Sequence, residues 1–148
     1  AIDRLGVPVT DVLKEYKPAD RREAGDAKAV EFACPGSVLR MQFDQAHPVA
    51  YGMPEEAPAM FIQSPAFRLT PVLGDKGPAV IAKYPADEIL MSGYLKGDWL
   101  LKNTVAAADV PLGKGRVILL GFGVEQRGQP HGTFKLLFNS LYYGVMVK

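Results

Sequence analysis

Alternation of apolar and polar residues is clearest in the first half of the chain. Residues 30–43 read as extended structure interrupted at Pro35-Gly36, with one apolar set on alternate positions: Leu39, Met41 and Phe43. A period of two places that set on one side of a strand, so the pattern predicts a strand with one buried face. Shorter apolar runs at 59–63 and 80–83 predict two more strands.

The N-terminal residues predict two short helical pieces. Residues 1–5 read as the last turn of a helix that ends at Gly6. Thr10 is placed to cap a second short helix over 11–16, with an acidic residue at its positive end. The polar stretch 17–28 follows, and its charges alternate in sign, which is typical of a solvated loop.

The last third of the chain predicts a hairpin. Two apolar segments, 105–110 and 116–122, flank a short turn in which Gly113 and Gly115 allow positive φ. Within the second segment, 117–120 is an unbroken apolar run, which favours a central strand covered on both faces.

A helix is predicted from His131 onward. Apolar residues recur there at the spacing of one helical face, namely Phe134, Leu137, Phe138, Leu141 and Val145. Pro130 suits the helix start and Gly144 its end. We expect this helix to pack on the sheet through that face. The loop 123–129 then joins a strand to a helix, and ligands of open α/β sheets bind at such loops.

Composition sets the broad class of the protein. The 148 residues suffice for one domain, and 48% hydrophobic with 22% charged residues can form a packed core. A net charge of +1 gives no basic surface for nucleic acid, and no apolar run is long enough to span a membrane. We therefore expect neither a nucleic-acid nor a membrane partner.

The loop before the predicted helix gathers the first candidate ligand-binding residues: Glu125, Gln126, Arg127 and Gln129. His131 follows at the helix start, where free backbone N–H groups favour an anion, and Arg127 could hold a carboxylate or phosphate. The structural alternative is that Glu125 and Arg127 pair with neighbouring loops and that His131 caps the helix.

The second candidate site combines His47 with Asp44. A carboxylate beside an imidazole fixes its tautomer and supports its protonated form, as a general base or a metal ligand requires. His47, Asp44 and His131 are therefore the candidate catalytic residues, with a turn-stabilising histidine as the alternative. No zinc-ligand spacing occurs, so neither a metal nor another cofactor is expected.

Other reactive side chains lack the context that chemistry requires. Cys34 is followed by Pro35 and then a strand, which is not a nucleophile elbow, and we expect a buried thiol. Trp99, Tyr94, Tyr142 and Tyr143 could instead form a sugar-stacking surface, although aromatic residues at such spacing are usually core.

Four segments also carry a family resemblance: EFACPGSVLRMQFD, HPVAYGMPEE, ILMSGYLKGDWLL and VPLGKGRVILLGFGVEQRGQPHGTFKLLFNSL. Together they resemble the region that follows the catalytic domain in bacterial zinc-carboxypeptidase-like proteins. That region is described as glutamine-amidotransferase-like, with a flavodoxin-like α/β fold. The resemblance implies an α/β sheet with a C-terminal hairpin and packing helix, and an extracellular or periplasmic location.

Two departures limit what the resemblance implies. Neither His47 nor His131 has the glutamate of the peptidase zinc motif, and no Cys-His-Glu triad is recognisable. Residues 1–148 also resemble only the latter part of that domain, a single partial domain with a truncated sheet. Because a truncated sheet exposes backbone groups and apolar surface, we expect a homodimer or larger oligomer, and an upstream peptidase domain as a further partner.

These observations favour a non-catalytic accessory or oligomerisation module of a secreted hydrolase. One alternative is a small hydrolase whose site gathers Asp44, His47, Glu125, Arg127 and His131 at the strand ends. Another is a small-ligand or carbohydrate-binding module. If the two imidazoles converge within about 5 Å across an open cleft, the hydrolase is favoured.

Overall fold

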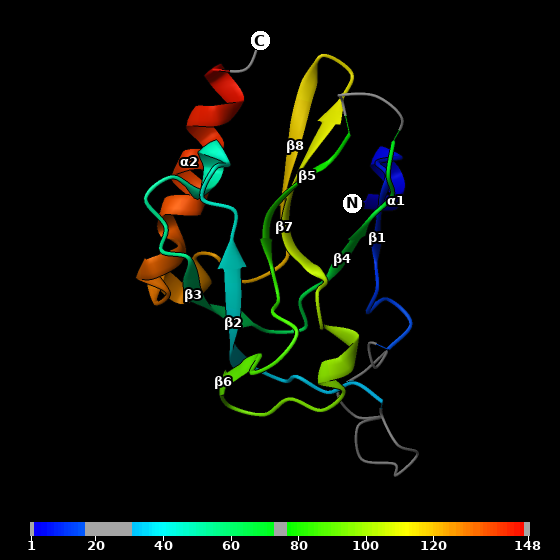
Figure 1. The fold of residues 1–148 in the computed structure, drawn as a ribbon, viewed down its shortest axis with the longest axis vertical. Coiled ribbons are helices and arrows are strands. Elements are labelled where there is room, and N and C mark those ends of the chain that lie inside the picture. The colour runs from blue at the N-terminus through cyan, green and yellow to red at the C-terminus, as the bar shows by residue number, and fades with distance from the viewer. Residues whose placement is uncertain (1, 17–30, 73–76, 147–148) are drawn as a thin grey trace.

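The computed structural model describes residues 2–16, 31–72 and 77–146 (Figure 1). Eight strands, two α-helices and four 3-10 turns make up this part of the chain. In order they are α1 (Ile2–Leu5), β1 (Val9–Asp11), β2 (Ser37–Phe43), η2 (Pro48–Ala50), β3 (Glu56–Phe61), β4 (Phe67–Leu69), β5 (Ala79–Lys83), β6 (Leu90–Ser92), η3 (Asp98–Leu100), β7 (Val105–Leu112), β8 (Gly115–Leu120), η4 (Gln126–Gly128), η5 (His131–Thr133) and α2 (Phe134–Met146).

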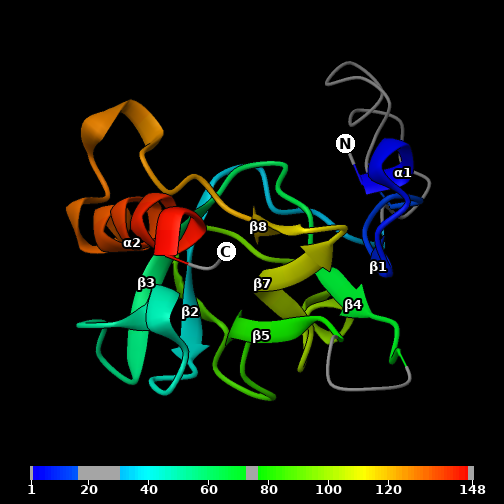
Figure 2. The same cartoon turned by 90° about the horizontal axis from the view of Figure 1, so that it is seen from above.

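The strands form one sheet in the order β1-β4-β7-β5-β2-β3, with β6 beside β2 and β8 beside β7. The helix α2 lies against one side of the β2 and β3 end, and α1 lies at the opposite end beside β1 (Figure 2). A sheet with a packing helix fits the predicted α/β class in its broad sense. However, every pair of described strands is antiparallel, whereas a flavodoxin-like sheet is parallel, so that finer expectation is not supported.

The predicted hairpin is confirmed, with Leu112 opposite Gly115 and two residues in the turn. Gly113 has φ +59° and no other turn residue has positive φ, so the glycine at 115 was not needed for the turn. The assignment of the central strand was wrong. β7 contacts β4, β5 and β8 and is buried over residues 105–110, whereas β8 pairs with β7 alone and is half-buried.

In the first half, the alternation predicted for β2 is confirmed, since Leu39, Met41 and Phe43 are buried and the positions between them are half-buried. The helix predicted over 11–16 is absent, because Asp11 belongs to β1 and pairs with Phe67. Its carboxylate accepts hydrogen bonds from the backbone N–H groups of Leu13 and Ala66, which turns the chain out of the strand. The helical turn before Gly6 is confirmed for residues 2–5, and the polar stretch 17–28 lies outside the described residues.

The C-terminal helix is confirmed, but only part of its predicted face is covered: Phe134 and Leu137 are half-buried, and Leu137 packs against the core. Leu136 is fully buried, while Phe138, Leu141 and Val145 of the predicted stripe are exposed. The polar residue Asn139 decides this orientation, because its amide donates to the carbonyl oxygens of Val49 (3.0 Å) and Tyr51 (2.9 Å). The helix also continues past Gly144 to Met146.

Candidate functional site

Asp44 does not orient His47 in the way the sequence predicted. The Asp44 carboxylate is exposed and accepts a hydrogen bond from the backbone N–H of Ala46 (3.0 Å). The backbone N–H of His47 donates to the Asp44 carbonyl oxygen (3.0 Å). Asp44 therefore shapes the turn after β2, since its short side chain bonds two residues onward. The pairing of these two side chains was a wrong prediction.

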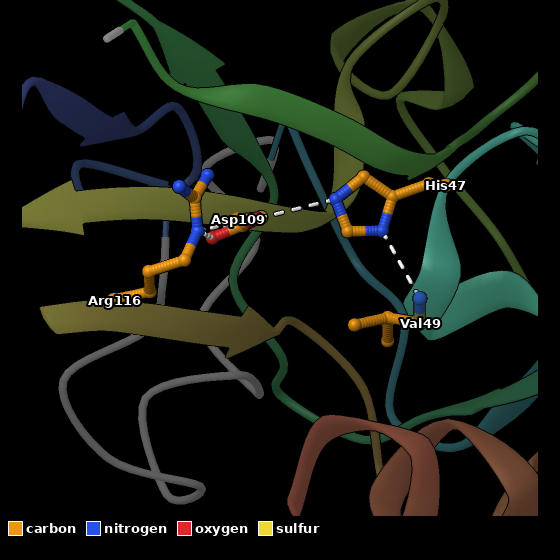
Figure 3. A network of polar contacts seen from close by, with 4 residues as sticks. All are labelled: His47, Val49, Asp109 and Arg116. Carbon is orange, nitrogen blue, oxygen red and sulfur yellow. Dashed lines mark hydrogen bonds and ion pairs between the residues drawn. The ribbon is translucent and has the colours of Figure 1, made fainter. Parts of the chain in front are cut away.

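The His47 ring instead points toward β7 (Figure 3). Its Nε2 lies 3.2 Å from Oδ2 of Asp109, and its Nδ1 accepts a hydrogen bond from the Val49 backbone N–H at 3.2 Å. Because Nδ1 is an acceptor, the hydrogen-bond pattern places the ring proton on Nε2. The Nε2–H group then donates a hydrogen bond to the Asp109 carboxylate. His47 also begins the turn η2, so its ring bonds fix the chain direction after β2.

Asp109 is a fully buried carboxylate in the middle of β7, and Arg116 neutralises it. The Nε of Arg116 donates to both Asp109 oxygens, at 2.7 and 2.8 Å. The hairpin register makes this contact possible, because Asp109 lies opposite Ile118 and Arg116 is its diagonal neighbour on the same face. The carboxylate raises the pKa of the Arg116 guanidinium further above its ordinary value.

Tyr143 of α2 closes the group. Its ring meets the His47 ring edge-on with the centroids 5.6 Å apart, and the Arg116 guanidinium carbon lies 5.8 Å from the Tyr143 ring centroid. Burial raises the pKa of the Tyr143 phenol, and the negative charge of Asp109 raises it further. We call His47, Asp109, Arg116 and Tyr143 the buried network.

The geometry of the buried network is that of a structural anchor. Both ring nitrogens of His47 are occupied by protein partners, and both Asp109 oxygens are bonded to Arg116. The side chains of His47 and Asp109 are 8% and 0% exposed. A general base needs a free nitrogen within reach of substrate, and His47 offers none in this arrangement. The network ties η2, the β7–β8 hairpin and α2 together.

The residues that sequence reasoning missed are Asp109 and Arg116. A detectable signal was present, because Asp109 is the one charged residue in an otherwise apolar strand at 105–110. A buried charge requires a partner, and the predicted hairpin turn places Arg116 on the same face two residues out of register. The sequence indicates Tyr143 only as one of four aromatic residues that could form a sugar-stacking surface.

The second candidate region, Glu125, Gln126, Arg127, Gln129 and His131, is named here the loop cluster. All of these residues are exposed except Gln126, which is half-buried. Within the described residues, none of their side chains forms a hydrogen bond or ion pair, so the predicted pairing of Glu125 and Arg127 with neighbouring loops is not found. Arg127 has a left-handed backbone with φ +52°.

His131 does not cap the helix and does not approach His47. Its ring lies against Phe134, with the centroids 5.3 Å apart. His47 contacts Tyr143, which lies nine residues further along the same helix, roughly 14 Å at 1.5 Å per residue. The two imidazoles therefore do not share a cleft, and the condition that would favour a hydrolase is not met.

The remaining candidates give no site either. Cys34 is buried as expected, and burial raises the pKa of its thiol. Trp99 packs edge-on against Tyr16, on a different element from Tyr142 and Tyr143. In the described part of the chain, no three His, Cys, Asp or Glu side chains are grouped closely enough to hold a metal ion.

A different surface stands out on α2. Its solvent side carries a run of large apolar side chains that we call the outer face: Phe138, Leu141, Tyr142, Val145 and Met146. Their exposed fractions range from 55% for Phe138 to 80% for Met146. Contiguous apolar surface of this kind marks interaction sites on folded proteins.

No protein-family model matches the sequence, and no curated protein or solved structure matches it. Among the described residues, no helix combines the length and apolar character of a membrane span.

Proposed function

We propose that the chain is a non-catalytic accessory module that associates with a second copy of itself through the outer face of α2. The single observation that carries this proposal is that the five large apolar side chains of the outer face are exposed to solvent, while Leu136, Leu137 and Asn139 on the other side hold the helix on the domain. An apolar face of this size costs solubility unless a partner covers it.

The charge pattern favours a second copy as the partner. Among its 13 residues, α2 has one charged side chain, Lys135, in the first turn. Its Nζ donates to the carbonyl oxygen of Gly52, 3.0 Å away, on the domain itself. Two outer faces can therefore meet about a two-fold axis without opposing like charges, as an isologous dimer requires.

The wider setting of the module is proposed from the four resembling segments alone. They indicate the latter part of a glutamine-amidotransferase-like domain, attached to or working with a secreted bacterial zinc-carboxypeptidase-like hydrolase outside the cytoplasm. In that setting a dimeric module would bring two hydrolase domains together.

Light scattering after size exclusion tests the dimer at protein concentrations from about 1 to 100 μM, the usual range of weak homodimers. We expect the wild type to be dimeric and Leu141→Glu/Val145→Glu to be monomeric with unchanged thermal stability, because both side chains are mostly exposed. Met91→Glu on β6, at a position 46% exposed, is the matched control and should stay dimeric. A wild type that is monomeric throughout this range rules the proposal out.

A further inference from the structure

The sheet opens beside β8. β4 meets β7 at one residue pair, Phe67 with Val105, and β8 takes over as the neighbour of β7 from residue 107 onward. Beyond that point the β1–β4 pair and the β7–β8 hairpin separate. Between them lies a cavity of about 490 Å³, lined by apolar residues and by two charged ones: Ile2, Val9, Pro65, Phe67 and residues 118–120 of β8, together with Thr10, Asp11 and Lys14. We call this cavity the sheet opening.

The backbone of β8 presents hydrogen-bonding groups on this side. The N–H of Gly121 donates to Ala106, which fixes the alternation of bonded pairs along the hairpin. Residues 117 and 119 therefore bond to β7, and the N–H and C=O groups of Arg116, Ile118 and Leu120 point away from it. Within the described residues, no backbone or side-chain group bonds to these outward positions.

The opposite edge of the sheet shows what a protected edge looks like in this molecule. The outward positions of β3 are 56, 58 and 60, since the N–H of Phe43 donates to Glu55. Pro58 has no N–H to offer, and the carbonyl of Met60 accepts from the Gly123 N–H at 2.9 Å. Proline and covering loops are the usual ways to block strand addition.

In the part of the chain that the structure describes, β8 has neither protection. It contains no proline, and its single charged side chain, Arg116, is turned onto Asp109. The remaining residues, 117–120, are Val-Ile-Leu-Leu. A small apolar molecule in the sheet opening would leave the outward N–H and C=O groups without partners, which costs free energy, whereas a peptide backbone satisfies them.

From this geometry we infer that the sheet opening binds an extended peptide segment, which adds to the sheet as a strand beside β8. Main-chain hydrogen bonds to Ile118 and Leu120 hold the peptide, and its inward side chains, at every second position, contact Val9 and Phe67. This site is separate from the outer face of α2, so peptide binding here can be tested independently of the proposed dimer.

The probe is a blocked heptapeptide, Lys-Val-Thr-Val-Thr-Val-Lys, titrated into isotopically labelled protein and followed by NMR. We expect shifts at the amides of Ile118 and Leu120, and hydrogen exchange at these amides slowed about tenfold or more. The same peptide with N-methyl groups on all five residues between its lysines has no N–H to donate on either strand edge and should cause neither change. No response up to about 1 mM of the unmodified peptide overturns the inference.

A protein variant supplies a second test. Ile118→Pro removes an outward N–H and leaves the β7 bonds in place, so the variant should fold and lose peptide binding. Ile118→Ala loses the same side chain, keeps the N–H and should retain binding. Equal peptide binding by both variants contradicts strand addition. If the proline variant does not fold, the comparison of the N-methylated and unmodified peptides still tests strand addition. If hydrogen exchange at the Ile118 amide slows as the protein concentration rises, with no peptide present, a second copy of the chain pairs with this edge. That result overturns the peptide proposal.

Discussion

The buried network and the loop cluster contain the same kinds of side chain, an acid, an arginine and a histidine, yet they differ in every physical respect. In the buried network, Asp109 and His47 are shielded from water and bonded on all their ring nitrogens and carboxylate oxygens. In the loop cluster, Glu125, Arg127 and His131 are exposed. The difference teaches that polar residues close together in the sequence are not thereby close to a partner.

The largest difference between the two regions is expected when one carboxylate charge is removed from each. Asp109→Asn leaves Arg116 without its counter-ion in a half-buried position, and we expect a loss of about 3 kcal/mol in the free energy of unfolding. Glu125→Gln makes the same chemical change at an exposed site and should change it by less than about 0.5 kcal/mol. Urea denaturation measures both, and equal effects would contradict the assignment of Asp109 as the buried anchor.

The two histidines provide a second, smaller contrast. His47→Ala loses the bonds to Asp109 and Val49 and the edge-on contact with Tyr143, so we expect a loss of about 2 kcal/mol. His131→Ala removes a ring that touches Phe134 at the surface, and its effect should stay within about 0.5 kcal/mol. If instead the His131 variant were the more destabilised, the histidine in the loop would be the structural one.

Measuring stability against pH tests whether Tyr143 belongs to the buried network. Its pKa is raised above 10.0 in the folded protein, first by burial and then by Asp109, so the unfolded chain loses the proton at lower pH than the folded one. The contribution of the protonated Tyr143 phenol to stability is therefore fully present below pH 10.0. It is lost as the pH rises from there through the folded pKa. The difference in unfolding free energy between wild type and Tyr143→Phe should be constant below pH 10.0, and above it the wild type should lose stability relative to the variant. Parallel curves would show that the phenol is not part of the network.

The smallest expected effect concerns the loop backbone. Arg127 adopts φ +52°, which costs free energy in any residue with a side chain. Arg127→Gly relieves this strain, but glycine loses more backbone entropy on folding than arginine. We expect a net gain of about 0.5 kcal/mol in the free energy of unfolding. Arg127→Ala keeps the strain and should give no gain in thermal denaturation. A destabilised glycine variant would mean that the Arg127 side chain has a partner after all.

Local patterns predicted the elements that local physics decides. β2 followed from strict alternation, and the β7–β8 hairpin followed from a glycine able to adopt positive φ. Both features depend on neighbours in the sequence alone. The same is true of the turn at Gly6.

Contacts between distant residues decided the rest. The apolar stripe of α2 was predicted to be its buried face, but Phe138, Leu141 and Val145 are exposed, because buried Leu136 and the Asn139 bonds to the carbonyls of Val49 and Tyr51 set the rotation of the helix. The apolar run at 117–120 was interpreted as a central strand, although β7, with its small alanines, fills that position. Neither outcome can be read from one segment, because each is set by a partner more than 80 residues away or by the order of strands.

The position of β7 in the chain has a consequence for synthesis on the ribosome. β7 joins β4, β5 and β8, so until residues 105–112 have emerged the nascent chain holds two separate fragments, β1 with β4 and β5 with β2 and β3. Neither fragment has a complete set of backbone partners during that interval. The unfinished polypeptide is thus most vulnerable to proteases and chaperone capture just before residues 105–112 are made.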